Sequence, residues 1–206
     1  MNTIAWDIDD TLGDCQLSWI KWLANQGYGD FKRSDFKTYN LSETFKCPVP
    51  EAQRRLALFL ESEELDAMMP FPEATRLLER FSHLNQHAIT GRPVDILERT
   101  RGWVDKNFPG KIKHICATGA NPMHGRHTLK AEACKIIGAK LLIEDAPLFV
   151  PDCLMSDINV ILIEKPWNTS FDMKHPLLHR VEQLSQVGDI MEKILEATPR
   201  QSYTKV

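Results

Sequence analysis

Short apolar runs alternate with amphipathic segments along most of the chain. The runs Thr3–Trp6, Gln86–Thr90 and Leu141–Ile143 are compact and bounded by polar residues, which predicts buried strands. Two further strand candidates lie at Lys111–Ala117 and Ile158–Ile163. Strands that alternate with helices of about ten residues are typical of βαβ units, so the pattern predicts a parallel sheet.

Helical spacing of apolar residues fills the intervals between these runs. Outside the stretch 14–70, helices are predicted over Pro72–Leu84, Val94–Asn107, Thr128–Gly138 and Val187–Ala197. Because βαβ crossovers are right-handed, the carboxyl ends of the strands should all open at one edge of the sheet. The expected fold class is therefore α/β, a Rossmann-like parallel sheet with helices on both faces.

Residues 14–70 differ from the rest of the chain because they contain no strand-like apolar run. An amphipathic helix is predicted over Leu17–Gln26 and another over Ala52–Leu60, with a polar, turn-rich segment between them. We therefore predict a core domain of residues 1–13 and 71–206, with a small helical cap of residues 14–70 inserted after the first strand. The alternative is that these helices are simply the next helices of the core.

Composition narrows the class of protein. A chain of 206 residues can bury one core and a modest insert. The formal net charge of −3 argues against a nucleic-acid scaffold, so nucleic acid is an unlikely partner. The five cysteines are odd in number, scattered and without a CxxC pair, which favours reduced thiols in a cytoplasm. Neither a signal peptide nor an apolar run of about 20 residues is apparent, so no membrane association is expected, and a monomer or homodimer fits.

The first strand runs directly into an acidic segment, Asp7-Ile-Asp9-Asp10-Thr11. Residues i and i+2 of an extended segment share a face, so Asp7 and Asp9 should converge at the carboxyl edge of the sheet. Open α/β sheets bind their ligands at this edge. Clustered carboxylates repel one another, and a hard divalent cation would offset that repulsion. The alternative is an acidic loop that opens a helix, with an aspartate as its N-cap.

Later strand and helix ends supply further polar groups, namely Thr90 and Gly91, Lys130, and Asp145. Together with the acidic segment they match the needs of phosphoryl transfer to a carboxylate. One carboxylate attacks phosphorus, and a second carries protons to and from the reacting oxygens. A hydroxyl, backbone N–H groups and a lysine hold the phosphate oxygens, while a further carboxylate completes a Mg²⁺ site.

The order and spacing of these residues resemble the four motifs of the haloacid dehalogenase superfamily, whose members are mostly Mg²⁺-dependent phosphatases. The resemblance implies that Asp7 is the nucleophile and that Asp9 is the general acid and base, whose backbone carbonyl also binds the metal. It further implies that Thr90 binds phosphate, that Lys130 is the motif III lysine and that Asp145 is a metal ligand. The implied cofactor is Mg²⁺, held by Asp7, Asp9 and Asp145.

Within that superfamily, an insert after the first motif corresponds to a C1-type cap, which lies over the site and sets substrate choice. Three strings resemble the deoxyribonucleotidase-like branch, at Thr38–Leu41, Arg101–Pro109 and Pro166–Asn168. The implied substrate is a (deoxy)nucleoside monophosphate. The alternatives are a phosphatase of another small phosphometabolite or of polynucleotide ends, a dehalogenase with an Asp nucleophile, and a catalytically silent binding protein of the same fold.

Aromatic residues in the predicted cap divide into two groups. Trp19 and Trp22 lie on a helix at core spacing, which predicts that they are buried rather than a platform for a base. Tyr39 and Phe45 lie in the irregular part and are the better candidates for stacking on a nucleobase.

Several polar residues receive a structural interpretation. Arg92 is expected to pair with a carboxylate near its strand end, and Asp10 is expected to serve as an N-cap. His175 and His179 are interpreted as surface helix residues. The histidine pair in segment 124–127 lacks a neighbouring cysteine or carboxylate at ligand spacing, so a transition-metal site is not favoured there.

Overall fold

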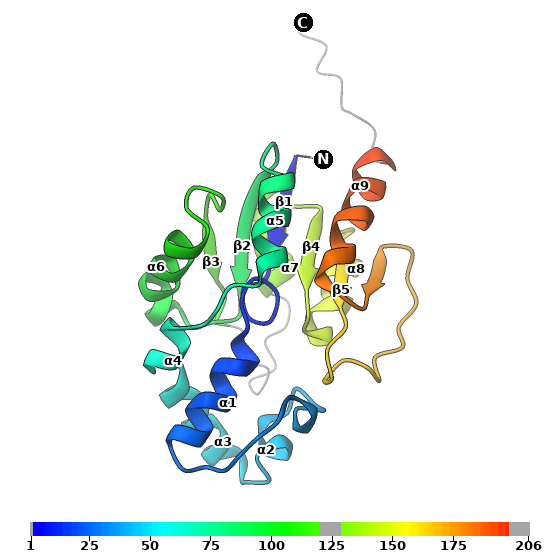
Figure 1. Cartoon of the computed structure of the whole chain (residues 1–206). Coiled ribbons are helices and arrows are strands. Elements are labelled where there is room, and N and C mark those ends of the chain that lie inside the picture. Colours follow the sequence, from blue (N-terminus) through cyan, green and yellow to red (C-terminus); the bar gives the residue numbers. More distant parts are fainter. Residues whose placement is uncertain (1, 120–128, 198–206) are drawn as a thin grey trace, which may run out of the picture.

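Six parallel strands form a single sheet in the order β3-β2-β1-β4-β5-β6 (Figure 1). The computed structural model describes residues 2–119 and 129–197. The strands are β1 (Thr3–Trp6), β2 (Asn85–Thr90), β3 (Ile115–Ala117), β4 (Leu141–Glu144), β5 (Asn159–Ile163) and β6 (Leu178–Val181). The predicted α/β fold with a Rossmann-like parallel sheet is therefore confirmed.

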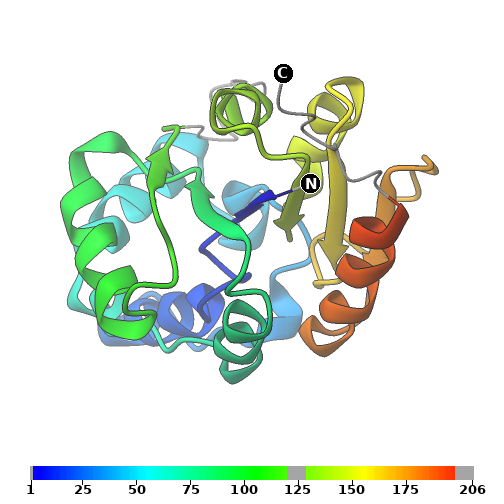
Figure 2. The same cartoon turned by 90° about the horizontal axis from the view of Figure 1, so that it is seen from above.

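Helices cover both faces of the sheet (Figure 2). One face carries α5 (Pro72–Arg80), α6 (Leu97–Asn107) and α9 (Val187–Ala197), and the other carries α7 (Leu129–Ile137) and α8 (Val150–Met155). Leu141 and Ile143 of β4 point into the first layer, whereas Leu142 between them points into the second. Because both faces are buried, β4 and β5 are apolar at consecutive positions rather than alternating.

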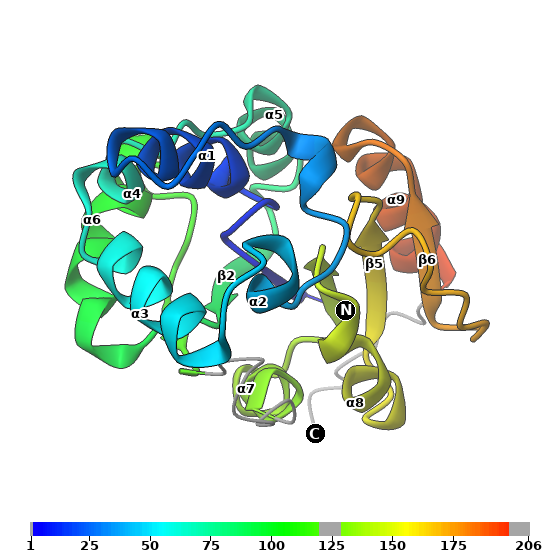
Figure 3. The same cartoon turned by 90° about the horizontal axis from the view of Figure 1, so that it is seen from below.

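A helical layer lies beyond the carboxyl ends of the strands, and Figure 3 shows it from that end. It consists of α1 (Cys15–Asn25), α2 (Leu41–Thr44), α3 (Val49–Leu60) and α4 (Glu63–Asp66). Its interior is aromatic, since Trp19 stacks on Phe59 at a centroid distance of 4.1 Å and meets Trp22 edge-on. The predicted burial of both tryptophans is confirmed. The division of the chain into a core domain and a cap domain remains a prediction.

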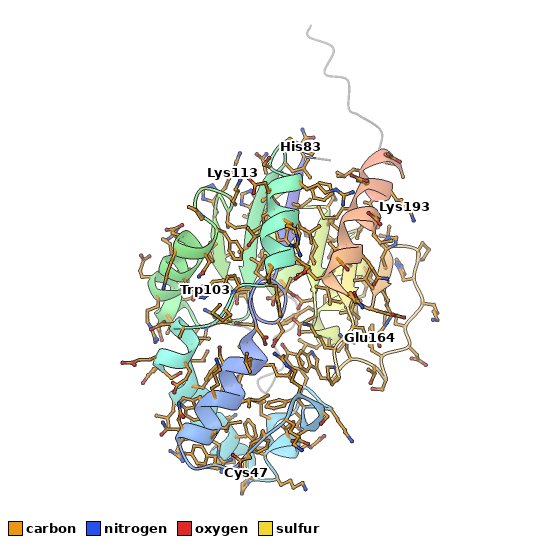
Figure 4. The ribbon with its side chains drawn as sticks, in the orientation of Figure 1. Cys47, His83, Trp103, Lys113, Glu164 and Lys193 are labelled. Carbon is orange, nitrogen blue, oxygen red and sulfur yellow. The ribbon has the colours of Figure 1, made fainter. Side chains whose placement is uncertain are left out.

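The chain enters and leaves this helical layer through a tightly packed crossing. The Asp14 N–H donates to the Met69 carbonyl at 2.8 Å, so the two connecting segments are bonded to each other. A Cβ on Gly13 would lie 2.6 Å from Met68 Cε and 2.7 Å from the Trp103 ring. Trp103 is labelled in Figure 4, and its indole N–H donates to the Met68 carbonyl at 2.7 Å. The close approach therefore requires glycine at position 13.

Two elements of the core were not predicted from the sequence. The short helix α8 begins at Val150-Pro151, where a proline is compatible with the first helical turn. The edge strand β6 contains His179, so the interpretation of His179 as a helix residue is wrong, and His175 lies in the loop that precedes the strand. Thr128 and the segment 124–127 lie outside the described residues, and the interpretations placed on them stay untested.

The cysteines and the lengths of the helices bear on the expected cellular context. All five cysteines are free thiols, in agreement with the absence of a disulfide framework. Across residues 2–119 and 129–197, no helix combines the length and the apolar character that crossing a membrane requires. The cytoplasmic location and the monomeric or homodimeric state stay predictions.

Candidate active site

The carboxyl ends of two adjacent strands bring three acidic side chains together. Trp6 of β1 lies in register with Ile143 of β4, and the Asp7 N–H donates to the Ile143 carbonyl at 2.9 Å. The next residues along the two strands are therefore neighbours across the sheet edge. Carboxylate oxygens of Asp7, Glu144 and Asp145 lie within 4.8 Å of one another, and all three side chains are buried.

Lys130 at the start of α7 extends its ammonium between two of these carboxylates. Its Nζ lies 2.5 Å from Asp7 Oδ1 and 2.7 Å from Glu144 Oε2, and the residue is 1% exposed. Burial by itself would lower the pKa of Lys130, but the charges of the two carboxylates outweigh it and raise that pKa. The ammonium is therefore charged at neutral pH and close enough to Asp7 to meet a group bound there.

Glu144 was not assigned a role from the sequence, although it precedes Asp145 at the end of a buried strand. Its Oε1 accepts the backbone N–H groups of Asp145 and Ala146 at 3.0 and 2.9 Å, while its Oε2 accepts Lys130. Both oxygens thus have protein partners. Glu144 is the buried counter-ion that holds Lys130 in place, and it has little capacity left for a cation.

The oxygens of Asp7 and Asp145 suit a hard divalent cation. Burial raises the pKa of both carboxyls well above the usual range, and the nearby carboxylates raise it further, with Lys130 opposing the rise at Asp7. Ionised oxygens packed this closely are costly without a compensating charge, and carboxylate oxygens are the ligands that Mg²⁺ prefers. The donor set therefore fits Mg²⁺. The carboxylate of Asp9 does not belong to this group of oxygens.

Arg92, two residues beyond the carboxyl end of β2, binds the Asp9 carboxylate. Its Nη2 lies 2.6 Å from Asp9 Oδ1 and its Nε lies 2.9 Å from Asp9 Oδ2, in a bidentate pair. Burial would raise the pKa of the Asp9 carboxyl, but the charge and hydrogen bonds of Arg92 outweigh burial and lower that pKa. The predicted pairing of Arg92 with a carboxylate near its strand end is confirmed.

The two predicted phosphate-binding residues at the end of β2 lie in different surroundings. Gly91 lines the cavity described below, as does Lys130 of α7, the third predicted phosphate-binding residue. Thr90 is fully buried, and its hydroxyl oxygen accepts the Arg92 backbone N–H at 3.2 Å. Contact of Thr90 with a phosphate remains a prediction.

Asp10 and Asp14 both support the first turn of α1. The N-cap is Asp14, whose Oδ1 accepts the Leu17 N–H at 3.0 Å, so the assignment of the N-cap to Asp10 is wrong. Asp10 has a positive φ of 58°, and its Oδ1 accepts the Gln16 N–H at 3.0 Å. Burial raises the pKa of Asp10 to about 7.

A cavity of about 210 Å³ separates this polar group from the helical layer. Asp7, Asp9, Lys130 and Asp145 line its polar end. The rest of the lining is mostly apolar and aromatic, and includes Trp19, Phe36, Tyr39, Leu56, Phe59 and Trp167. Tyr39 thus reaches the site, whereas Phe45 is 7% exposed within the core of the helical layer and is not part of the cavity wall. The proposed stacking role of Phe45 is therefore wrong.

Comparison with known proteins identifies the fold but not a sequence family. No family model matches the sequence, and no curated protein matches it. Among solved structures, a haloacid dehalogenase-like family hydrolase from Streptococcus pneumoniae superposes with a TM-score of 0.68 at 13% identity, covering 93% of this chain and 98% of that one. The chain has the fold of the haloacid dehalogenase-like hydrolases.

Two other solved structures with this fold carry different names. A predicted phosphoglycolate phosphatase from Haemophilus somnus gives a TM-score of 0.61 at 11% identity, covering 93% of this chain and 98% of that one. A 2-haloacid dehalogenase from Pseudomonas syringae gives 0.52 at 16% identity, covering 94% and 99%. At such identities the likeness concerns the fold alone, because one fold hosts several activities. The resemblance to the deoxyribonucleotidase-like branch remains a prediction.

Proposed function

We propose that this protein is a magnesium-dependent phosphomonoester hydrolase that acts through an aspartyl-phosphate at Asp7. The observation that carries the proposal is the buried group at the strand ends. There, the Lys130 ammonium lies 2.5 Å from Asp7, and a second buried carboxylate, Asp145, lies beside Asp7. This group opens into a cavity large enough for an organic leaving group.

Asp7 would attack phosphorus through a carboxylate oxygen, so that a P–O bond forms to Asp7 and the bond to the leaving oxygen breaks. The departing oxygen takes its proton through Asp9, which lies two residues on at the same cavity and receives that proton from the substrate bound as its monoanion. In the second step Asp9 accepts a proton from water, the hydroxide oxygen attacks phosphorus, and the Asp7 carboxylate is released. The low pKa that Arg92 imposes on Asp9 suits this second step, because the carboxylate is ionised and ready to accept.

Lys130 would hold a non-bridging phosphate oxygen, because its ammonium already lies beside Asp7 in a buried site. We extend the same role to Thr90 and to the backbone N–H of Gly91 on the strength of the family resemblance. A bound Mg²⁺ would neutralise charge on the phosphate oxygens. Asp7 and Asp145, with the backbone carbonyl of Asp9, would be its protein ligands.

The substrate we favour is a (deoxy)nucleoside monophosphate. Phosphate oxygens need the polar end of the cavity, whereas the flat face of a base would stack on an aromatic side chain of the lining such as Tyr39. The cavity volume of about 210 Å³ is below the roughly 300–1,000 Å³ of many ligand pockets, which favours a single small phosphate ester over a polynucleotide end.

The test is a phosphatase screen with purified protein over nucleotides, sugar phosphates, phosphoglycolate and p-nitrophenyl phosphate. EDTA and Asp7→Asn should each abolish turnover, and Asp9→Asn should trap one phosphoryl group on the protein, detected by intact mass. Asp105→Asn on the exposed side of α6 is the matched control and should retain activity.

Other outcomes would replace the proposal. Turnover that persists in EDTA or in Asp7→Asn would refute the mechanism. Halide release from a 2-haloacid without Mg²⁺ would identify a dehalogenase instead. A salt-sensitive shift with RNA or DNA ends, together with their dephosphorylation, would favour a polynucleotide end phosphatase, and inactivity on every compound would favour a binding protein.

A further inference from the structure

The segment Pro166–Asn168 follows β5 and is tied to the loop after β4. The Asn168 Nδ2 group donates to the Asp145 carbonyl and to the Ile163 carbonyl, both at 2.8 Å. Its Oδ1 accepts the Lys165 N–H at 3.1 Å, and the residue is fully buried. One amide side chain therefore joins the ends of β4 and β5 and fixes the backbone of Asp145.

Trp167 fixes the side chain of the same residue. Its indole N–H donates to Asp145 Oδ2 at 2.9 Å, and the residue is 9% exposed. An indole N–H is a donor only and points in one direction, so it sets the rotation of the carboxylate it binds. One carboxylate oxygen is held by the indole, which leaves the other oxygen available for a cation.

The ring of Trp167 also forms part of the substrate cavity. Tyr39 from the helical layer meets it edge-on, with centroids 6.5 Å apart and planes at 72°. A single side chain thus contacts both the acidic group and the apolar wall. Packing alone would explain a buried aromatic ring, but it would not require the indole nitrogen to be directed at Asp145.

We infer that Trp167 and Asn168 are positioning residues that hold Asp145 in the orientation needed to bind a divalent cation together with Asp7. The inference rests on the proposed function. Asp145 lies within 4.8 Å of two other carboxylates, and mutual repulsion favours its rotation away from them when nothing holds it. Hydrogen bonds from residues outside the ligand set oppose that rotation, so the ligands are preorganised before the cation arrives.

Trp167→Phe is the decisive substitution, because it removes the N–H donor and keeps an aromatic ring in the wall. Trp103→Phe is the matched control, since it also deletes a buried indole hydrogen bond, to the Met68 carbonyl. Isothermal titration of the substrate-free protein with Mg²⁺ should give a dissociation constant about 10–100-fold higher for Trp167→Phe. Trp103→Phe should bind Mg²⁺ like the wild type. Raising Mg²⁺ should restore the phosphatase activity of Trp167→Phe.

Terbium luminescence provides a second measurement, whose deciding result comes from the wild type and so does not depend on the folding of a variant. Tb³⁺ is a hard cation that an adjacent excited indole sensitises, so wild type and Trp103→Phe should both emit on indole excitation and lose the emission when Mg²⁺ competes. Trp167→Phe should lose most of it. Bound Tb³⁺ without sensitised emission in the wild type would overturn the inference, as would equal Mg²⁺ affinity in Trp167→Phe. A wild type that binds neither cation would refute the proposed metal dependence itself, which separates the two failures.

Discussion

Replacing Lys130 by methionine tests the electrostatic arrangement on which the site depends. The side chain is 2% exposed and bonds two carboxylates, at 2.5 and 2.7 Å. Methionine has a similar volume and no charge, so Asp7 and Glu144 would be left buried and uncompensated. Removal of one partner from a buried ion pair costs about 3–5 kcal/mol. For a chain of this length that corresponds to a fall of roughly 6–20 °C in Tm.

An exposed lysine pair provides the comparison. Lys111 Nζ lies 3.0 Å from a Glu79 oxygen, but their side chains are 30% and 69% exposed. Solvent screens such a pair, so Lys111→Met should cost about 1 kcal/mol or less. Urea unfolding of both variants in EDTA at pH 7 measures the difference directly. A double variant that adds Glu144→Gln should recover part of the loss caused by Lys130→Met, because it removes one of the two unpaired charges.

The pH dependence follows from the same charges. The pKa of Lys130 is raised in the folded protein, so its contribution is fully present below the unfolded lysine pKa of about 10.4 and is constant around neutrality. In Lys130→Met, the pKa of Asp7, already raised by burial, should rise further. Folded Asp7 then binds a proton where unfolded Asp7 does not, so the penalty should shrink as pH falls toward the unfolded Asp pKa of about 3.9. A Lys130→Met protein as stable as Lys111→Met at pH 7, with no such trend, would refute the reasoning.

Two further changes test packing and burial elsewhere near the site. Gly13→Ala should destabilise the fold by about 1–3 kcal/mol, because its Cβ would lie 2.7 Å from the ring of Trp103. Thermal melting checks this, with Gly102→Ala as the control because a Cβ there meets open space. Burial raises the pKa of Asp10 to about 7, so between an unfolded pKa of about 3.9 and that value the folded state binds more protons and stability falls as pH rises. Asp10→Asn should flatten this fall in urea titrations in EDTA, and parallel pH profiles for the two proteins would contradict the assignment.

Local periodicity was sufficient for most of the fold. The apolar runs that form β1, β4 and β5 are recognisable because a strand buried on both faces is mostly apolar at consecutive positions. The helices on the two faces show 3.6-residue spacing for the same reason, since each buries one side. The sequence also placed Asp7 and Asp145 at strand ends, because parallel strands with right-handed crossovers present those ends at one edge.

The rest depended on contacts between residues far apart in the chain. The edge strand β6 contains His179 and Arg180 and owes its conformation to pairing with β5, which no local pattern reveals. Phe45 is a core residue because aromatic side chains of the helical layer pack around it. Arg92 pairs with Asp9, which lies 83 residues away in the sequence, and Trp167 hydrogen-bonds Asp145, which lies 22 residues away.

The secondary structure of a residue depends largely on its near neighbours in the sequence. Its side-chain partners depend on which distant segments the packed sheet brings beside it. The sequence therefore determined that carboxylates, a hydroxyl and a lysine gather at one edge of a parallel sheet. Only the tertiary structure decided that Glu144 neutralises Lys130, that Arg92 holds Asp9, and that an indole from the loop after β5 orients Asp145. Those choices are made by burial, because a charged or polar group removed from water must find its partner within the fold.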